Sequence, residues 1–322
     1  MFKNVGKRFA FIAILALILL VAACGGGSDE EGDGGSESSG DNGEATSESS
    51  EENEETSSSN VGEGKSIELV YVEWDTEIAS THVVGKVLED LGYDVTVTPL
   101  DNAVMWQSVA NGESDGMVAA WLPATHGNLY EEYKDQMVDL GANFEGAKIG
   151  AVAPEYLEID SLEQLPEIAD QVDSTITGIE PGAGVVQASE EAVEVYGGDG
   201  WEVQTSSSGA MATALGEAIS NEEPIIVTGW SPHWKFAEYD LKYLEDPEEV
   251  YGGAEEIKTF VREGLEEDLP NAYTVLDNFY WEEDVFNEVM LEIYNGTDPE
   301  EAAANFVENY PELVEEWTAD IE

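Results

Sequence analysis

The chain is poor in cysteine and histidine, the residues that build most disulfides and zinc sites. Among its 322 residues there is one cysteine, Cys24, so no disulfide can form within the chain and a cysteine-rich metal site is impossible. The three histidines, His82, His126 and His233, fall in separate segments without the spacing of metal ligands. The sequence therefore predicts neither a disulfide framework nor a metal site, and it indicates no cofactor.

Basic residues are also scarce: 11 Lys and Arg stand against 71 Asp and Glu, which gives a net charge of −60. Nucleic acid is excluded as a partner because no basic stripe exists to neutralise phosphates, and a patch for anionic lipid is equally disfavoured. Such an acidic surface suits concentrated salt, where charges are screened over about 3 Å at 1 M. We interpret it as a halophilic adaptation and not as part of the binding chemistry.

A long apolar run is missing too. The longest one, residues 9–23, has 15 residues, whereas a membrane-spanning helix needs roughly 20. It follows three basic residues and ends in small residues directly before Cys24. This is the pattern of a secretory signal peptide, and its end resembles the bacterial lipobox. We therefore predict a lipoprotein signal peptide at residues 1–23, with Cys24 acylated and the protein held on the extracytoplasmic face of the cell membrane.

The segment after Cys24 consists mainly of Gly, Ser, Glu, Asp and Asn. Residues 25–64 contain 13 acidic residues, no basic ones and almost nothing apolar. Such a segment cannot bury enough surface to fold, so we predict a disordered tether over residues 24–64. The folded part then covers residues 65–322, whose 58 acidic and eight basic residues give a net charge of −50.

From Lys65 onward, strand-like and helix-like patterns alternate, which predicts an α/β fold with a mostly parallel sheet. The pattern breaks near residues 150–154, resumes, and becomes mostly helical from Glu255 on. We predict two α/β lobes around a ligand cleft: lobe I from residues 65–152 and 255–322, and lobe II from residues 153–254. The expected strands are 67–72, 94–98, 116–120, 175–179, 201–205 and 225–228. A first helix is expected to be capped by Asp75 and Thr76 and to end at Gly92, and further helices are expected over 102–111, 185–196 and 208–220.

Three of the eight tryptophans follow apolar strands of this pattern: Trp74, Trp121 and Trp230. In open α/β sheets, ligands lie beyond the carboxyl ends of the strands. Two of these tryptophans belong to the first block and one to the second, so closure of the lobes would bring them together. Three indole faces attract a cation without hydrogen-bond donors, such as a quaternary ammonium group. Position alone leaves the alternative of ordinary core tryptophans open.

A glycine-rich turn, Gly182-Ala183-Gly184, lies between a predicted strand and a predicted helix. Free backbone N–H groups and the positive helix end favour an anion at such a turn. It is not a dinucleotide fingerprint, because the third glycine would fall at Gln187. Beside an aromatic cage (Trp74, Trp121 and Trp230), the turn would hold the carboxylate of a zwitterion.

Four segments of the chain are distinctive: WDTEIAS at 74–80, WLPATH at 121–126, GIEPGAG at 178–184 and TGWSPHW at 228–234. Together they resemble the glycine betaine/proline betaine-binding lipoproteins of compatible-solute ABC importers. The resemblance extends over nearly all of residues 65–317, and it implies the type II periplasmic-binding-protein fold. Some family members are circularly permuted relative to this order.

The resemblance also implies the roles of individual residues. In that family three tryptophans surround the trimethylammonium group, and Trp74, Trp121 and Trp230 occupy the matching positions. The carboxylate clamp matches the backbone amides of Gly184 and Val185 and the side chain of His126. The implied partners are a small zwitterion such as glycine betaine or proline betaine, a membrane permease and its cytoplasmic ATPase. We expect the protein to be a monomer that serves osmoprotection.

Two alternatives stay open. The first is an extracellular enzyme that acts on a choline- or betaine-like ester; no Ser-His or Cys-His arrangement is evident, and residues 206–209 do not form a nucleophile elbow, so we expect no enzyme. The second is a binding protein for choline, carnitine or a sulfonium solute, although a carboxylate clamp argues against choline. The remaining tryptophans are expected in the core or at its boundary: Trp106, Trp201, Trp234, Trp281 and Trp317.

Overall fold

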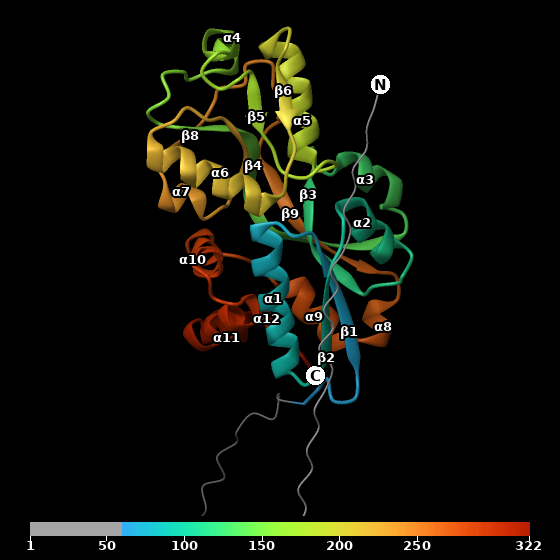
Figure 1. Cartoon of the computed structure of the whole chain (residues 1–322). Helices are drawn as coiled ribbons and strands as arrows, with labels where there is room; N and C mark the ends of the chain where they lie inside the picture. The colour runs from blue at the N-terminus through green and yellow to red at the C-terminus, as the bar shows by residue number, and fades with distance from the viewer. Residues whose placement is uncertain (1–59) are drawn as a thin grey trace, which may run out of the picture. The chain divides into compact units, whose positions relative to one another are not determined.

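A curled nine-stranded sheet with helices packed against it forms the framework of residues 60–322, which are the residues that the computed structural model describes (Figure 1). The strand order is β2-β1-β3-β9-β4-β7-β5-β6, and β8 pairs with β4 off this path. The strands are β1 (Ser66–Tyr71), β2 (Asp94–Pro99), β3 (Gly116–Leu122), β4 (Met137–Pro154), β5 (Thr175–Thr177), β6 (Glu202–Gln204), β7 (Val227–Ser231), β8 (Leu241–Tyr243) and β9 (Glu255–Arg262).

Helices surround both ends of this sheet. Alpha helices α1, α10, α11 and α12 gather beside the β1 end, whereas α4, α5 and α6 lie around β5 and β6 (Figure 1). Within residues 60–322, no helix combines the length and the apolar character that crossing a membrane requires. The helices are α1 (Asp75–Asp90), α2 (Asn102–Ala110), α3 (Gly127–Tyr133), α4 (Leu165–Ile168), α5 (Gly184–Ala192), α6 (Ser208–Asn221), α7 (Lys235–Glu238), α8 (Leu265–Asp268), α9 (Pro270–Asn278), α10 (Glu283–Tyr294), α11 (Pro299–Asn309) and α12 (Pro311–Trp317), with η1 (Leu162–Gln164) as a 3-10 helix and η2 (Val193–Gly197) as a π-helix.

The predicted α/β alternation is confirmed at both ends of the sheet. Strand β1 pairs in parallel with β2 and β3, and β5 pairs in parallel with β6 and β7. Helix α1 connects β1 to β2 and buries an apolar face that includes Val83, Val84 and Val87. This short β-α-β connection is what the local sequence pattern specifies.

The middle of the sheet differs from the prediction. A mostly parallel sheet and a helical chain from Glu255 on were expected, but β9 begins at Glu255 and pairs antiparallel with both β3 and β4. Strand β4 is 18 residues long and pairs antiparallel with β7, β8 and β9. The β4–β9 register shifts three times. Such irregularities bend a strand, and they let one strand serve both ends of the sheet.

Residues 60–64 form a turn that packs on the body of the protein, although the tether was predicted to end at residue 64. The backbone N–H of Gly62 donates to the carbonyl of Leu91 at 2.9 Å, and a Cβ at Gly62 would lie 2.4 Å from the ring of Tyr93. The turn is held by these contacts with the α1–β2 connection. The predicted signal peptide, Cys24 and the rest of the tether lie outside the described residues, and the lobe boundaries stay a prediction.

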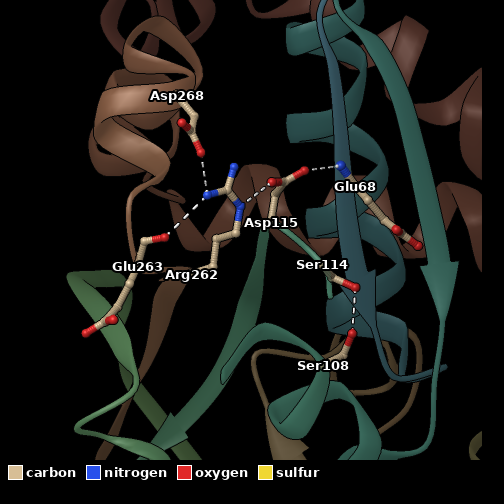
Figure 2. Close-up of polar contacts among 7 residues, drawn as sticks. All are labelled: Glu68, Ser108, Ser114, Asp115, Arg262, Glu263 and Asp268. Carbon is tan, nitrogen blue, oxygen red and sulfur yellow. Dashed lines mark hydrogen bonds and ion pairs between the residues drawn. The ribbon is translucent and has the colours of Figure 1, made fainter. Parts of the chain in front are cut away.

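A partly buried ion pair ties three strands of the sheet together (Figure 2). Arg262 on β9 donates to Asp115 at 2.7 Å and to Asp268 at 2.8 Å. The second oxygen of Asp115 accepts from the backbone N–H of Glu68 on β1, also at 2.8 Å. Since Asp115 directly precedes β3, this one carboxylate joins β1, β3 and β9.

The tryptophans that were assigned to the core are buried, apart from Trp201, which is partly exposed. Trp281 stacks on Phe286 and meets Trp317 edge-on, at centroid distances of 4.5 and 5.7 Å. The indole of Trp281 also donates to Ser80 on α1 at 2.9 Å. This cluster fastens the C-terminal helices to α1, away from the ends of the strands.

Candidate functional site

A cavity opens where β1, β3 and β7 end, and the three predicted tryptophans line it together. About 260 Å³ of atom-free space, which includes open solvent at its mouth, belongs to this cavity. The centroids of Trp74 and Trp230 are 6.5 Å apart with an angle of 51° between the ring planes. We call this space the tryptophan cavity; its lining consists of Trp74, Trp121, Thr125, Ile149, Ile179, Gly184, Val185 and Trp230.

Two of these tryptophans lie within strands, and the third precedes a helix. Trp121 and Trp230 lie within β3 and β7, where they pair with Ile257 and Ile149 across antiparallel contacts. Trp74 follows β1 and occupies the extended N-cap position of α1. All three rings are at most 5% exposed. The aromatic cage is thus anchored on regular structure at both ends of the sheet.

The indole N–H groups of the cage have different partners. Trp121 donates to the carboxylate of Glu77 on α1 at 2.7 Å, and Trp74 donates to the carboxylate of Glu180 in the glycine turn. The indole nitrogen of Trp230 has no hydrogen-bond partner among the described residues. Burial raises the pKa of Glu77 to about 7, although donation from Thr76 and Trp121 opposes this shift.

The glycine turn brings backbone donors to the same cavity. Gly184 and Val185 are the first residues of α5, so their N–H groups have no partner inside the helix. Gly182 adopts a φ of +95°, which disfavours other residues. A Cβ at Gly184 would lie 2.3 Å from the carbonyl oxygen of Thr125. Only glycine allows this close approach between the turn and the segment that follows β3.

His126 is buried behind the cavity and is not part of its lining. Its Nδ1 accepts the backbone N–H of Trp121 at 3.0 Å, so Nε2 carries the proton of the neutral ring. That Nε2 has no partner among the described residues. Burial lowers the pKa of His126 to about 3, which keeps the ring neutral. The ring also stacks on Trp74 at a centroid distance of 5.7 Å.

Asp75 has a role that its sequence position concealed. It was expected to cap α1, but Trp74 occupies the N-cap position and Asp75 is the first residue of the helix. Its carboxylate accepts from the indole of Trp234 at 2.6 Å and from the hydroxyl of Ser208 at 2.9 Å. Burial would raise its pKa, but His233 at 3.5 Å and these donors outweigh burial and lower it. Asp75 therefore links α1 to the segments around α6 and α7.

Lys235 was not singled out from the sequence, yet it is fully buried beside the site. Its ammonium lies 4.1 Å from the ring centroid of Trp230 and has no hydrogen-bond partner among residues 60–322. Lys235 lies over the ring of Trp230 but is not part of the lining of the tryptophan cavity. Burial lowers the pKa of Lys235 to about 7, with nearby Asp75 opposing the shift.

The structure separates the other histidines from this cavity. His82 lies on α1 and lines a surface groove together with Lys86 and Glu300. The rings of His233 and Trp230 meet in a T-shaped arrangement, with their centroids 4.7 Å apart. In the part of the chain that the structure describes, no group of three His, Cys, Asp or Glu side chains is arranged to hold a metal ion. The site is therefore built from aromatic faces, backbone N–H groups and buried carboxylates.

Comparison with known proteins places this arrangement in a family. Residues 65–309 match the family model described as the substrate-binding domain of an ABC-type glycine betaine transport system. The chain belongs to this family. Its members are proteins that bind a substrate for transport, and the mixed α/β fold with its curled sheet is theirs.

Relatives with known names or structures agree with this membership. The glycine betaine/carnitine transport binding protein GbuC of Listeria monocytogenes is 49% identical over 158 residues, which are 48% of this chain and 53% of that protein. The match thus spans about half the length of this curated relative. Lactococcal OpuAC, solved in a closed form with glycine betaine, is 49% identical and covers 79% of this chain and 99% of its own, with a TM-score of 0.74.

A further solved relative binds choline. It is a choline-binding protein of an ABC transporter in complex with choline, 29% identical, with a TM-score of 0.73 over 80% of this chain and 92% of that one. Relatives with this fold have thus been solved with a ligand that carries a carboxylate and with one that does not.

Proposed function

We propose that the protein captures glycine betaine, or a closely related zwitterionic osmolyte, and delivers it to an ABC permease. One observation carries the proposal: Trp74, Trp121 and Trp230 line a single small cavity together with the first residues of α5. The indole faces suit a trimethylammonium group, which offers no hydrogen-bond donor. The free N–H groups of Gly184 and Val185 suit a carboxylate that lies a few ångströms from the ammonium group of the same ligand.

The energetics of such a site are consistent with useful affinity. Micromolar binding corresponds to about 8 kcal/mol. Each ring can contribute about 0.5–2 kcal/mol to a desolvated cation, so three rings supply at most about 6 kcal/mol. Hydrogen bonds to the carboxylate and burial of the methyl groups must supply the rest. In this proposal the ligand carboxylate also reaches past the present lining and accepts a hydrogen bond from the Nε2–H of His126, which has no partner among the described residues.

Isothermal titration with glycine betaine, proline betaine, carnitine and choline tests the proposal. We expect the carboxylate-bearing ligands to bind more tightly than choline. Replacing Trp74, Trp121 or Trp230 with alanine should weaken betaine binding, whereas Trp281→Ala, in the C-terminal aromatic cluster, should lower stability and leave affinity nearly unchanged. Near-normal affinity in all three cage variants would refute the aromatic cage. Incubation of betaine and choline esters with the protein, followed by product analysis, tests for the enzymatic alternative.

The location follows from the same proposal. A binding protein for an importer works on the extracytoplasmic side, and the lipobox-like sequence before Cys24 supports a lipid anchor there. The acidic surface would then face a saline medium. Metabolic labelling with a radioactive fatty acid should label the full chain and should fail to label Cys24→Ala, with the loss of the protein from the membrane fraction as a second measurement.

A further inference from the structure

Two carboxylates stand directly behind the aromatic cage, and the proposed function does not yet use them. Glu77 accepts the indole N–H of Trp121 at 2.7 Å, and Glu180 accepts that of Trp74. Glu77 is 1% exposed, and Glu180 is half-buried. They reach the cage from different places, since Glu77 lies in the first turn of α1 and Glu180 in the glycine turn.

Neither carboxylate has a cationic side chain as its partner. The ion pairs within residues 60–322 involve other acids and leave out Glu77 and Glu180. An ionised carboxylate away from water is strongly unfavourable unless an opposite charge compensates it. Lys235 does not supply that charge here, because it lies over Trp230 and interacts electrostatically with Asp75 and His233.

A ligand cation in the tryptophan cavity would supply the missing charge. A cation on an indole face lies within about 6 Å of the ring centroid, so it would stand about 8 Å from a carboxylate bound to the N–H of that ring. An acceptor at the N–H also fixes the orientation of the ring and increases the electron density on its face. Both effects favour a positive head group over a neutral one.

We infer that Glu77 and Glu180 are specificity-determining residues, which hold Trp121 and Trp74 by their indole N–H groups and make the cavity select a cationic head group over a neutral group of the same shape. The inference rests on the proposed function, because it concerns the same cavity. Trp230 differs from the other two rings: it has no carboxylate at its N–H, and Lys235 lies over its ring. The selection therefore depends mainly on the Trp74 and Trp121 side of the cage.

A pair of ligands with one shape separates this role from simple support of the rings. In 3,3-dimethylbutanoate a quaternary carbon replaces the nitrogen of glycine betaine, so the three methyl groups and the carboxylate remain while the positive charge is lost. Glu77→Gln and Glu180→Gln keep an oxygen that can accept the indole N–H but remove the negative charge. Affinities for both ligands are measured at pH 8.5 and constant salt by titration and by competition followed through tryptophan fluorescence.

Each glutamine variant should lower the affinity for betaine about thirtyfold, as expected for unit charges about 8 Å apart at an effective dielectric constant of about 20. The affinity for 3,3-dimethylbutanoate should stay the same or rise. Asp115→Asn is the matched control, because this carboxylate is paired with Arg262 far from the cavity (Figure 2); it should leave the ratio of the two affinities unchanged. Melting curves check that each variant folds, and the half-buried Glu180 gives a test that does not depend on the core.

The outcomes divide clearly. A reduced preference for betaine in either glutamine variant supports the inference. Equal weakening of both ligands would overturn it and leave the glutamates as structural supports of the rings, and unchanged affinities would overturn it as well. If the unmodified chain binds no betaine at all, the proposed function itself is wrong, and that result is distinct because it appears before any variant is made.

Discussion

Replacing Lys235 with methionine should stabilise the protein, and the structure allows the size of the effect to be worked out. The Lys235 side chain is fully buried, and its ammonium has no hydrogen-bond acceptor among the described residues. The aromatic ring nearest to this ammonium is that of Trp230. Methionine has a similar length and no charge. The variant therefore removes an uncompensated polar group and keeps most of the packing.

The magnitude follows from proton linkage. Burial lowers the pKa of Lys235 to about 7 from its ordinary value of 10.5. Between these pH values the unfolded chain binds more protons at this residue than the folded chain does, so stability rises with pH. At pH 7 the difference corresponds to about 4 kcal/mol of lost stability. For a chain of this size, that is roughly 10 °C in the melting temperature.

Urea unfolding of both proteins at pH 7 and pH 9, in the same high salt, measures this effect. The Lys235→Met variant should be more stable at pH 7, and its advantage should shrink by pH 9, since the wild-type lysine is then neutral in the folded state. Groups that do not interact with Lys235 titrate equally in both proteins and cancel in the comparison. A variant that is no more stable than the wild type at pH 7 would refute the reasoning, and so would a gain in stability that is the same at pH 7 and pH 9.

Four further predictions concern the site and the surface. His126→Ala should weaken betaine by about 1–3 kcal/mol and choline little; equal losses in titration would make His126 structural. Asp75→Asn should destabilise the fold by about 2–4 kcal/mol in urea unfolding at pH 7, and the difference should vanish at low pH, because a carboxyl with a lowered pKa loses its contribution as it is protonated. Betaine affinity should fall from pH 8.5 to pH 6 as Glu77 gains a proton, and Glu77→Gln should flatten that profile. Salt from about 0.05 to 2 M should raise the melting temperature and leave betaine affinity nearly constant; an affinity that collapses while the protein stays folded would show that exposed charges hold the ligand.

The ends of the sheet could be predicted from the sequence, and its middle could not. Strands β1, β2 and β3 alternate with α1 and α2 over short distances, so the local pattern is sufficient. Strand β4 carries Gly141 and Gly146 at positive φ and shifts register repeatedly against β9. The sequence of β4 therefore lacks the regular alternation of apolar and polar residues that indicates a strand. Strand β9 begins with two glutamates, of which Glu255 is buried because it accepts from Ala124 and Thr125. Only tertiary contacts explain that burial.

The site shows the same division. Large aromatic residues at strand ends stand out in a sequence, and the cavity contains the three that were predicted. Glu77, in contrast, looks like an ordinary acid in the first turn of a helix, where the helix dipole favours it. Lys235 looks like a surface lysine at the start of a short helix. Both are buried only because distant segments close over them, so no local pattern could have found them.

The placement of charge explains how so acidic a protein can hold a ligand without net charge. Most of its carboxylates face solvent, where salt screens them and they act alike on every ligand. Glu77 and Glu180 differ because indole N–H groups orient them behind two rings of one small cavity. Screening penetrates such a site poorly, so in the proposed binding mode these two carboxylates would act on the near end of a zwitterion, while the N–H groups of Gly184 and Val185 would act on its far end. The surface charge and the binding chemistry are therefore separable, because the first acts over the whole molecule and the second only within a few ångströms of the rings.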